Sequence, residues 1–236
     1  MIRIRPSQER GHAEHGWLTS HHTFSFADYY DPKEMGFGDL RVINEDTING
    51  GGGFAAHPHR NMEILTYVLE GALRHEDNMG NGSIIHAGDA QRMSAGTGVV
   101  HSESNASSDT PVHLFQIWLL PDRTGYAPEY EQLTFSADLR QGHFQLLASG
   151  DPKDAGLHWH QDARLLTAEL NTGATVTYTL APRRRAYLHL IRGAVTIDQL
   201  DLVTGDGCRI EQESHIVLKA RKDSAVLLFD LRAAAA

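Results

Sequence analysis

Cysteine is nearly absent from the sequence. Cys208 is the one cysteine among 236 residues, so no disulfide can form within the chain. The fold must therefore rest on a packed core, and a chain of 236 residues is long enough to build one. The lack of a disulfide framework agrees with a reducing compartment, and we expect a cytoplasmic protein.

Long apolar runs are also missing. Residues 1–20 carry Arg3, Arg5 and Arg10 but no apolar stretch, so they do not resemble a secretory signal. The most apolar stretch, 114–120, is far too short to cross a bilayer. We expect no membrane partner.

Positive charge is in short supply. The chain has 21 Lys and Arg against 30 Asp and Glu, which gives a formal net charge of -9. Nucleic acids and anionic membranes attract basic surfaces, so we expect no direct contact with nucleic acid. The only basic run, at 183–185, is interpreted as a solvated turn. We expect a monomer.

Helical periodicity is scarce, and short alternating segments dominate. Segments such as 62–69 and 112–120 read as strands and are separated by Gly- and Pro-containing turns. Only 129–139 and the neighbourhood of Asp162 are ambiguous. This pattern predicts an all-β fold of two antiparallel β-sandwich or barrel domains, with a candidate linker at 121–128.

Two histidine-containing segments differ from the rest. His57 and His59, and likewise His101 and Glu103, are two residues apart. Residues at this spacing on a strand point to the same face, so two adjacent strands would aim three imidazoles and one carboxylate at one point. Such a set suits one divalent transition metal and leaves coordination positions free for substrate. Iron(II) is our first candidate, and nickel, manganese, copper and zinc also fit.

The two halves of the chain share a pattern of turns. Gly71 and Gly88 follow apolar strands in the first half, and Gly193 and Gly205 follow similar strands in the second half. The repeat predicts two domains of the same architecture.

The second copy lacks the metal-binding residues. Aligning the glycines places three other residues at the positions of the three histidines: Thr179, Ala181 and Leu218. We therefore predict a metal-binding domain over 1–125 and a degenerate domain without metal ligands over 126–236.

At this point the chain resembles a known family. The segments 51–71 and 88–105 look like the two motifs of the cupin superfamily. The closer resemblance is to pirins, on three features: His57-Pro58-His59 with Met62-Glu63, Ser94 to Gly98 with His101-x-Glu103, and Arg10-Gly11-His12 to Asp31-Pro32. It covers nearly the whole chain and is closest to bacterial pirins described as quercetin 2,3-dioxygenases.

The resemblance implies a jelly-roll bicupin with its metal in the first domain. The family ligands carry over to His57, His59, His101 and Glu103. Glu63 stands one residue before the position that supplies a glutamate ligand in other cupins, so it is not a ligand. At an odd position on its strand it would face the opposite way, in a supporting or structural role.

The resemblance also implies an activity. A quercetin 2,3-dioxygenase opens the central ring of a flavonol with dioxygen and releases carbon monoxide. Glu103 would be the catalytic base that takes the proton of the 3-hydroxyl group. Candidate residues of the substrate pocket are Phe24, Phe26, Phe54, Arg60, Gln116 and Trp118. Core packing is the alternative for the aromatic residues, and a place at the rim is the alternative for Arg60.

Two other functions stay open. Related pirins are linked to transcriptional regulators, so the chain could be a metal-sensing regulatory module that acts on a protein partner. A different cupin chemistry, such as sugar isomerisation, is the other alternative. The sequence has no cluster of Lys and Arg near the ligands that would support a sugar-phosphate substrate. Metal-dependent turnover of quercetin separates the enzyme from the regulator.

Overall fold

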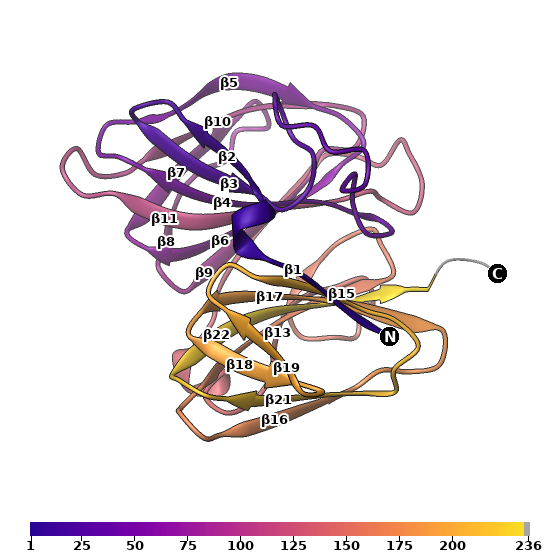
Figure 1. The fold of residues 1–236 in the computed structure, drawn as a ribbon. Coiled ribbons are helices and arrows are strands. Elements are labelled where there is room, and N and C mark those ends of the chain that lie inside the picture. Colours follow the sequence, from indigo (N-terminus) through magenta and orange to yellow (C-terminus); the bar gives the residue numbers. More distant parts are fainter. Residues whose placement is uncertain (234–236) are drawn as a thin grey trace. The chain divides into compact units, whose positions relative to one another are not determined.

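The computed structural model describes residues 1–233, which form two compact units (Figure 1). The N-terminal unit consists of Gly11–Phe135 and Leu157–Gln161. The C-terminal unit consists of Met1–Arg10, Ser136–Gly156 and Asp162–Ala236. The predicted division into 1–125 and 126–236 differs from these units in three segments, and residues 234–236 lie outside the described part of the chain.

Two antiparallel sheets build the N-terminal unit. The larger sheet has the strand order β12-β9-β6-β11-β4-β3-β2, and the smaller has the order β5-β10-β7-β8. The strands of the larger sheet are β2 (Gly11–Glu14), β3 (Leu18–His22), β4 (Leu40–Ile48), β6 (Glu63–Glu70), β9 (Asp89–Ser94), β11 (Val112–Leu119) and β12 (Glu129–Thr134). Those of the smaller sheet are β5 (Gly53–His59), β7 (Ala72–Asp77), β8 (Gly82–His86) and β10 (Val99–Asn105).

The core of this unit lies between its two sheets. Leu18 and Val68 of the larger sheet pack in one buried cluster with Leu73 and Ile85 of the smaller sheet. Strand residues alternate between two faces, so each sheet turns one apolar face inward.

The C-terminal unit repeats this plan. Its larger sheet contains β1-β20-β17-β22-β15-β13 in order, and its smaller sheet has the order β16-β21-β18-β19. The strands of the larger sheet are β1 (Ile2–Arg5), β13 (Gln145–Ser149), β15 (Ala163–Leu170), β17 (Arg184–Arg192), β20 (Gly207–Ile210) and β22 (Ser224–Arg232). Those of the smaller sheet are β16 (Thr175–Thr179), β18 (Ala194–Ile197), β19 (Leu200–Val203) and β21 (His215–Ala220).

Helix is confined to two short 3-10 turns within residues 1–233, η1 (Ser7–Glu9) and η2 (Ala137–Leu139). The predicted all-β fold of two sandwich domains is confirmed. No helix in this part of the chain has the length and apolar character needed to span a membrane.

The predicted repeat is visible in matching turns. Gly71 and Gly193 end equivalent strands, β6 and β17, with φ of 76° and 93°. Gly88 and Gly205 precede the equivalent strands β9 and β20 with φ of 89° and 84°. Side chains disfavour positive φ, which explains why glycine stands at these four turns in both copies.

The edge strands explain why the predicted boundary differs from the units. β12 follows β11 in the chain and pairs with β9. The equivalent edge of the C-terminal unit is filled by β1, which pairs with β20. The segment 121–128 therefore leads into another strand of the same unit instead of separating two domains.

A short segment from the second half of the chain completes the N-terminal unit. This strap, Leu157–Gln161, includes β14 (Leu157–His158) and buries Trp159 with 1% of its surface exposed. The backbone N–H of His158 donates to Glu131 at 2.9 Å, and the Gln161 amide donates to the Leu120 carbonyl at 2.8 Å. The strap is thus fixed by an anchor side chain and by hydrogen bonds.

One local prediction was wrong. In the basic run, Arg184 opens β17 and binds Asp230 at 2.6 Å, so the run is not simply a solvated turn.

Candidate metal centre

The two histidine-containing segments lie side by side as β5 and β10. His57 is the register partner of His101, and His59 is the partner of Val99. The ladder shifts register between His101 and Glu103, where a bulge interrupts the pairing. A side chain added at Gly53 would lie 2.6 Å from the backbone oxygen of Glu103, so glycine permits the close approach of the two strands here.

Three of the predicted ligands converge. The ring nitrogens that His57, His59 and His101 offer lie within 4.8 Å of one another. The ring centroids of the three are 4.5 to 4.9 Å apart. His57 places Nδ1 at 2.8 Å from the Ala55 carbonyl, and a proton donated there leaves Nε2 as the free ligand atom.

Two of these histidines are held in the neutral state that a metal requires. Burial, together with a smaller effect of the neighbouring histidines, lowers the pKa of His59 to about 4 and that of His101 to about 3. Nε2 of His101 is buried and has no hydrogen-bond partner within residues 1–233. An unpartnered buried nitrogen costs free energy, and a bound cation would relieve that cost. The donor set therefore fits a divalent metal.

Glu103 lies next to this cluster but belongs to a second group. Its ligand oxygen is within 4.8 Å of the ring nitrogens of His101 and His75. Its carboxylate accepts hydrogen bonds from Gln116 at 2.6 Å, Gln91 at 2.8 Å and Thr66 at 3.2 Å. Burial raises the pKa of Glu103 to about 7, although these donors act in the opposite direction.

The three donors belong to one row of polar side chains that crosses the larger sheet. Asn44 pairs in register with Gln116, Gln116 with Thr66, and Thr66 with Gln91. His22 extends the row, because it pairs with Asn44 and places Nδ1 at 2.9 Å from the Asn44 carbonyl oxygen. The row supports the carboxylate from the sheet that faces β10.

Most of the predicted pocket residues lie near the histidines. The Trp118 ring stands edge-on to His59 at 4.9 Å, and Phe26 stands edge-on to Trp118 at 5.4 Å. Phe54 lies 6.4 Å from His57 on the other side. Gln116 binds Glu103 directly. These contacts give the cluster an aromatic border.

The other candidates lie elsewhere. Phe24 is 1% exposed and belongs to the core. The exposed Arg60 donates to the Thr97 carbonyl at 3.1 Å. Glu63 accepts a hydrogen bond from Ser94 at 2.7 Å, and burial raises the pKa of this carboxyl group. Glu63 is outside both candidate metal groups.

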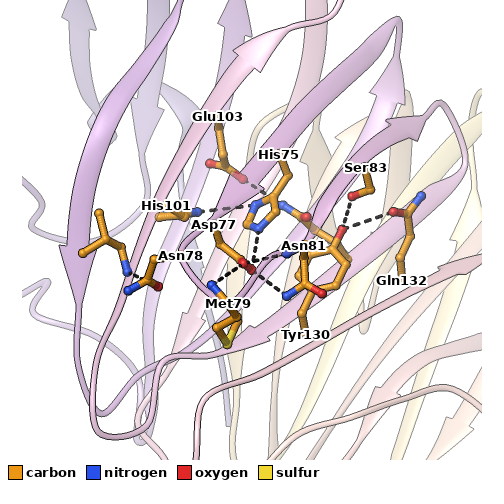
Figure 2. Close-up of polar contacts among 12 residues, drawn as sticks. His75, Asp77, Asn78, Met79, Asn81, Ser83, His101, Glu103, Tyr130 and Gln132 are labelled. Carbon is orange, nitrogen blue, oxygen red and sulfur yellow. Dashed lines mark hydrogen bonds and ion pairs between the residues drawn. The ribbon is translucent and has the colours of Figure 1, made fainter.

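Sequence reasoning missed the residues behind His101. His75 on β7 is the register partner of Glu103, and Asp77 is that of His101 (Figure 2). Tyr130 of β12 stacks on the His75 ring at 4.8 Å. A signal was present in the sequence, since His75 and Asp77 form another pair two residues apart, just before the glycine-containing segment 78–82.

Strand register corrects the predicted alignment of the two copies. Leu218 pairs with Ile197 as Glu103 pairs with His75, so Leu218 corresponds to Glu103 and not to His101. By the same register, the residues at the positions of His57 and His101 are Tyr178 and Ile216. The alignment shifted because the segments that join these glycines to the metal-binding strands differ in length between the copies: Glu103 stands 15 residues after Gly88, whereas Leu218 stands 13 residues after Gly205.

Comparison with known proteins agrees with this architecture. Residues 3–119 match the family model described as Pirin, and residues 146–231 match the model described as the quercetinase C-terminal cupin domain. A quercetin 2,3-dioxygenase of Escherichia coli K12 is 51% identical over 98% of this chain and 99% of its own length. This chain belongs to the pirin family.

Two further pirin relatives bear on the site. The pirin-like protein of Caulobacter vibrioides is 44% identical over 98% of this chain and 99% of its own length. The crystal structure of the bacterial pirin YhhW from E. coli in complex with nickel(II) matches with a TM-score of 0.93 and 49% identity, over 99% of this chain and 100% of that one. The predicted membership among quercetin 2,3-dioxygenase-like pirins is confirmed.

Proposed function

We propose that this pirin is a metal-dependent dioxygenase that cleaves a flavonol such as quercetin, with His57, His59, His101 and Glu103 as ligands. The convergence of three imidazoles, whose ligand nitrogens lie within 4.8 Å of one another beside a buried carboxylate, carries the proposal. The similarity to a named quercetin 2,3-dioxygenase over the full chain supports it. A divalent cation bound there would lower the pKa of a coordinated hydroxyl group and supply the site for dioxygen chemistry. Iron(II) remains our first candidate, and nickel(II) in the related pirin makes nickel the main alternative.

The histidines and the glutamate have different roles in this proposal. His57, His59 and His101 are the nitrogen donors that hold the cation, and the Trp118 ring packs against His59 beside it. Glu103 takes the proton of the flavonol 3-hydroxyl group. Burial raises the pKa of this carboxyl group and so favours the protonated form that results from the transfer.

The surroundings of Glu103 suit such a base. Gln91, Gln116 and Thr66 hold its two oxygens in place without supplying a positive charge. Trp118, Phe26 and Phe54 offer flat apolar surfaces to the aromatic rings of a flavonol.

The proposal is tested by following dioxygen uptake and carbon monoxide release with quercetin. Protein stripped of metal is reloaded with iron(II) or nickel(II) in separate samples. His59→Ala is expected to lose turnover in every sample, because it removes a ligand. His86→Ala, which changes an exposed histidine of β8, is the matched control and is expected to retain turnover.

Each outcome has a clear meaning. Turnover that needs the metal and is lost in His59→Ala supports the dioxygenase. Metal binding without turnover of quercetin would reject this substrate and favour a regulatory module. Equal turnover with and without metal would reject the metal centre.

A further inference from the structure

A buried histidine and a buried aspartate stand in line behind the ligand nitrogen of His101. Nε2 of His75 lies 3.3 Å from Oδ2 of Asp77, and Nδ1 of His75 lies 3.5 Å from Nδ1 of His101 (Figure 2). The side chains of His75 and Asp77 are both 0% exposed. The unpartnered Nε2 of His101 is on the opposite side of its ring from this contact.

We propose that Asp77 and His75 are positioning residues that fix the tautomer of His101 and aim its Nε2 at the metal. The proposal rests on the metal centre proposed above. A carboxylate only accepts, so His75 must donate its Nε2–H to Asp77. Neutral His75 then has a lone pair at Nδ1, which accepts a hydrogen bond from His101 Nδ1–H. His101 is left with a free lone pair at Nε2, as a metal ligand requires.

The hairpin turn after β7 sets the direction of these two hydrogen bonds. Oδ1 of Asp77 accepts backbone N–H groups of Met79 at 2.9 Å and Asn81 at 3.0 Å. Oδ2 accepts the Asn81 side-chain amide at 2.8 Å in addition to His75. These donors keep Asp77 oriented and ionised, and they lower the pKa of its carboxyl group. The Tyr130 ring stacked on His75 holds the imidazole plane.

His75 is better explained as a support than as a ligand. Its two ring nitrogens are already engaged, one by Asp77 and the other by His101. The C-terminal unit agrees with this role. There the register position of His75 is held by Ile197, in the same copy of the fold where Ile216 replaces His101. The C-terminal unit thus lacks both the supporting histidine and the histidine that it would support.

The direct test is the tautomer of His101 in the metal-free protein, read from ring ¹⁵N chemical shifts in wild type, Asp77→Asn and His75→Phe. Wild type is expected to carry the proton on Nδ1. In Asp77→Asn the amide oxygen would remain with the two backbone N–H groups and turn its NH₂ toward His75. His75 then accepts at Nε2, carries its own proton on Nδ1 and donates to Nδ1 of His101. The His101 proton therefore moves to Nε2. His75→Phe removes the acceptor, so the two tautomers are expected to mix.

The second readout is nickel(II) affinity, measured by competition with a chromophoric chelator. Loss of a supporting group of this kind costs about 10- to 100-fold in metal affinity. We expect that loss in Asp77→Asn and His75→Phe, and none in the matched control His86→Phe on the neighbouring strand β8. Asp77→Asn is nearly isosteric, so it remains informative if His75→Phe fails to fold.

The outcomes separate this inference from the proposed function. If wild type binds no nickel(II), the metal centre itself is rejected, whatever the tautomers are. If wild type binds nickel(II) but both variants keep its affinity within threefold and keep the Nδ1–H tautomer, only the positioning role is overturned. A metal-induced ¹⁵N shift at a His75 nitrogen in the zinc(II)-loaded wild type would also overturn it, because His75 would then be a ligand.

Discussion

Replacing Glu103 by glutamine should stabilise the metal-free protein at alkaline pH. The carboxyl group is 3% exposed, and burial raises its pKa from the ordinary value of 4.5 to about 7. The folded protein therefore keeps a proton on Glu103 between these two pH values, whereas the unfolded chain has lost it. Stability falls as pH rises wherever the folded state binds more protons, so Glu103 reduces the free energy of unfolding across this window.

The size of the effect follows from the two pKa values. At 1.36 kcal/mol for each pKa unit, the difference between 4.5 and about 7 amounts to about 3 kcal/mol. This cost is absent below about pH 4.5 and complete above about pH 7. Glutamine does not titrate, so the variant does not lose this free energy of unfolding as pH rises. One or two neighbouring amides, such as that of Gln91, must turn over to face the new NH₂ group, but that adjustment adds the same free energy at every pH.

Urea unfolding in the presence of a chelator provides the measurement. We compare Glu103→Gln with wild type at about pH 5 and about pH 8, within and above the window in which the carboxyl group titrates. From the lower to the higher pH, the free energy of unfolding of the variant minus that of wild type should increase by about 2 to 3 kcal/mol. Histidine titration is common to both proteins and drops out of the difference. A difference that does not change with pH would refute the raised pKa, and the variant should bind nickel(II) weakly in either case.

Three further perturbations test the fold and the pocket. Trp159→Ala empties the buried anchor of the strap and should cost about 3 to 5 kcal/mol in urea unfolding, and a loss below about 1 kcal/mol would show that the strap is not anchored there. Gly53→Ala places a methyl group against the backbone of Glu103, so nickel(II) affinity should fall, whereas Gly82→Ala meets open space and should not change it. Trp118→Leu removes the ring beside His59 and should raise the KM for quercetin about two- to tenfold with little change in kcat. A change confined to kcat would contradict a binding role for Trp118.

Periodicity and ligand spacing were sufficient to predict the fold class and the convergence of three of the predicted ligands, His57, His59 and His101. Alternation at period two marks strands, and the pairs at 57/59 and 101/103 depend only on that period. The turns at Gly71 and Gly193 revealed the repeat because glycine is needed where φ is positive. These are local properties, which a sequence states directly.

Register between strands was not predictable in the same way. Gln116 was predicted only as a pocket residue, and Thr66 and Gln91 were not predicted at all. The three become one set of donors only because three strands align them opposite Glu103. The exchange of edge strands is equally hidden. Nothing local in residues 2–5 indicates that they pair with β20, two hundred residues away.

The comparison between the two copies shows that a metal site on this fold needs more than its ligands. In the N-terminal unit the row that supports Glu103 is polar, and in the C-terminal unit the same register positions are apolar. The residues that replace Asn44, Gln116, Thr66 and Gln91 are Leu166, Leu228, Leu188 and Cys208.

A glutamate placed at Leu218 would therefore face leucines instead of amide and hydroxyl donors. A buried carboxylate without donors costs several kcal/mol, and it would escape that cost by staying protonated, which prevents it from binding a metal. The aliphatic row gives the C-terminal unit a stable core and at the same time excludes a metal centre there. Stability and metal binding thus make opposite demands on the same row of the sheet, and each copy of the fold meets one of them.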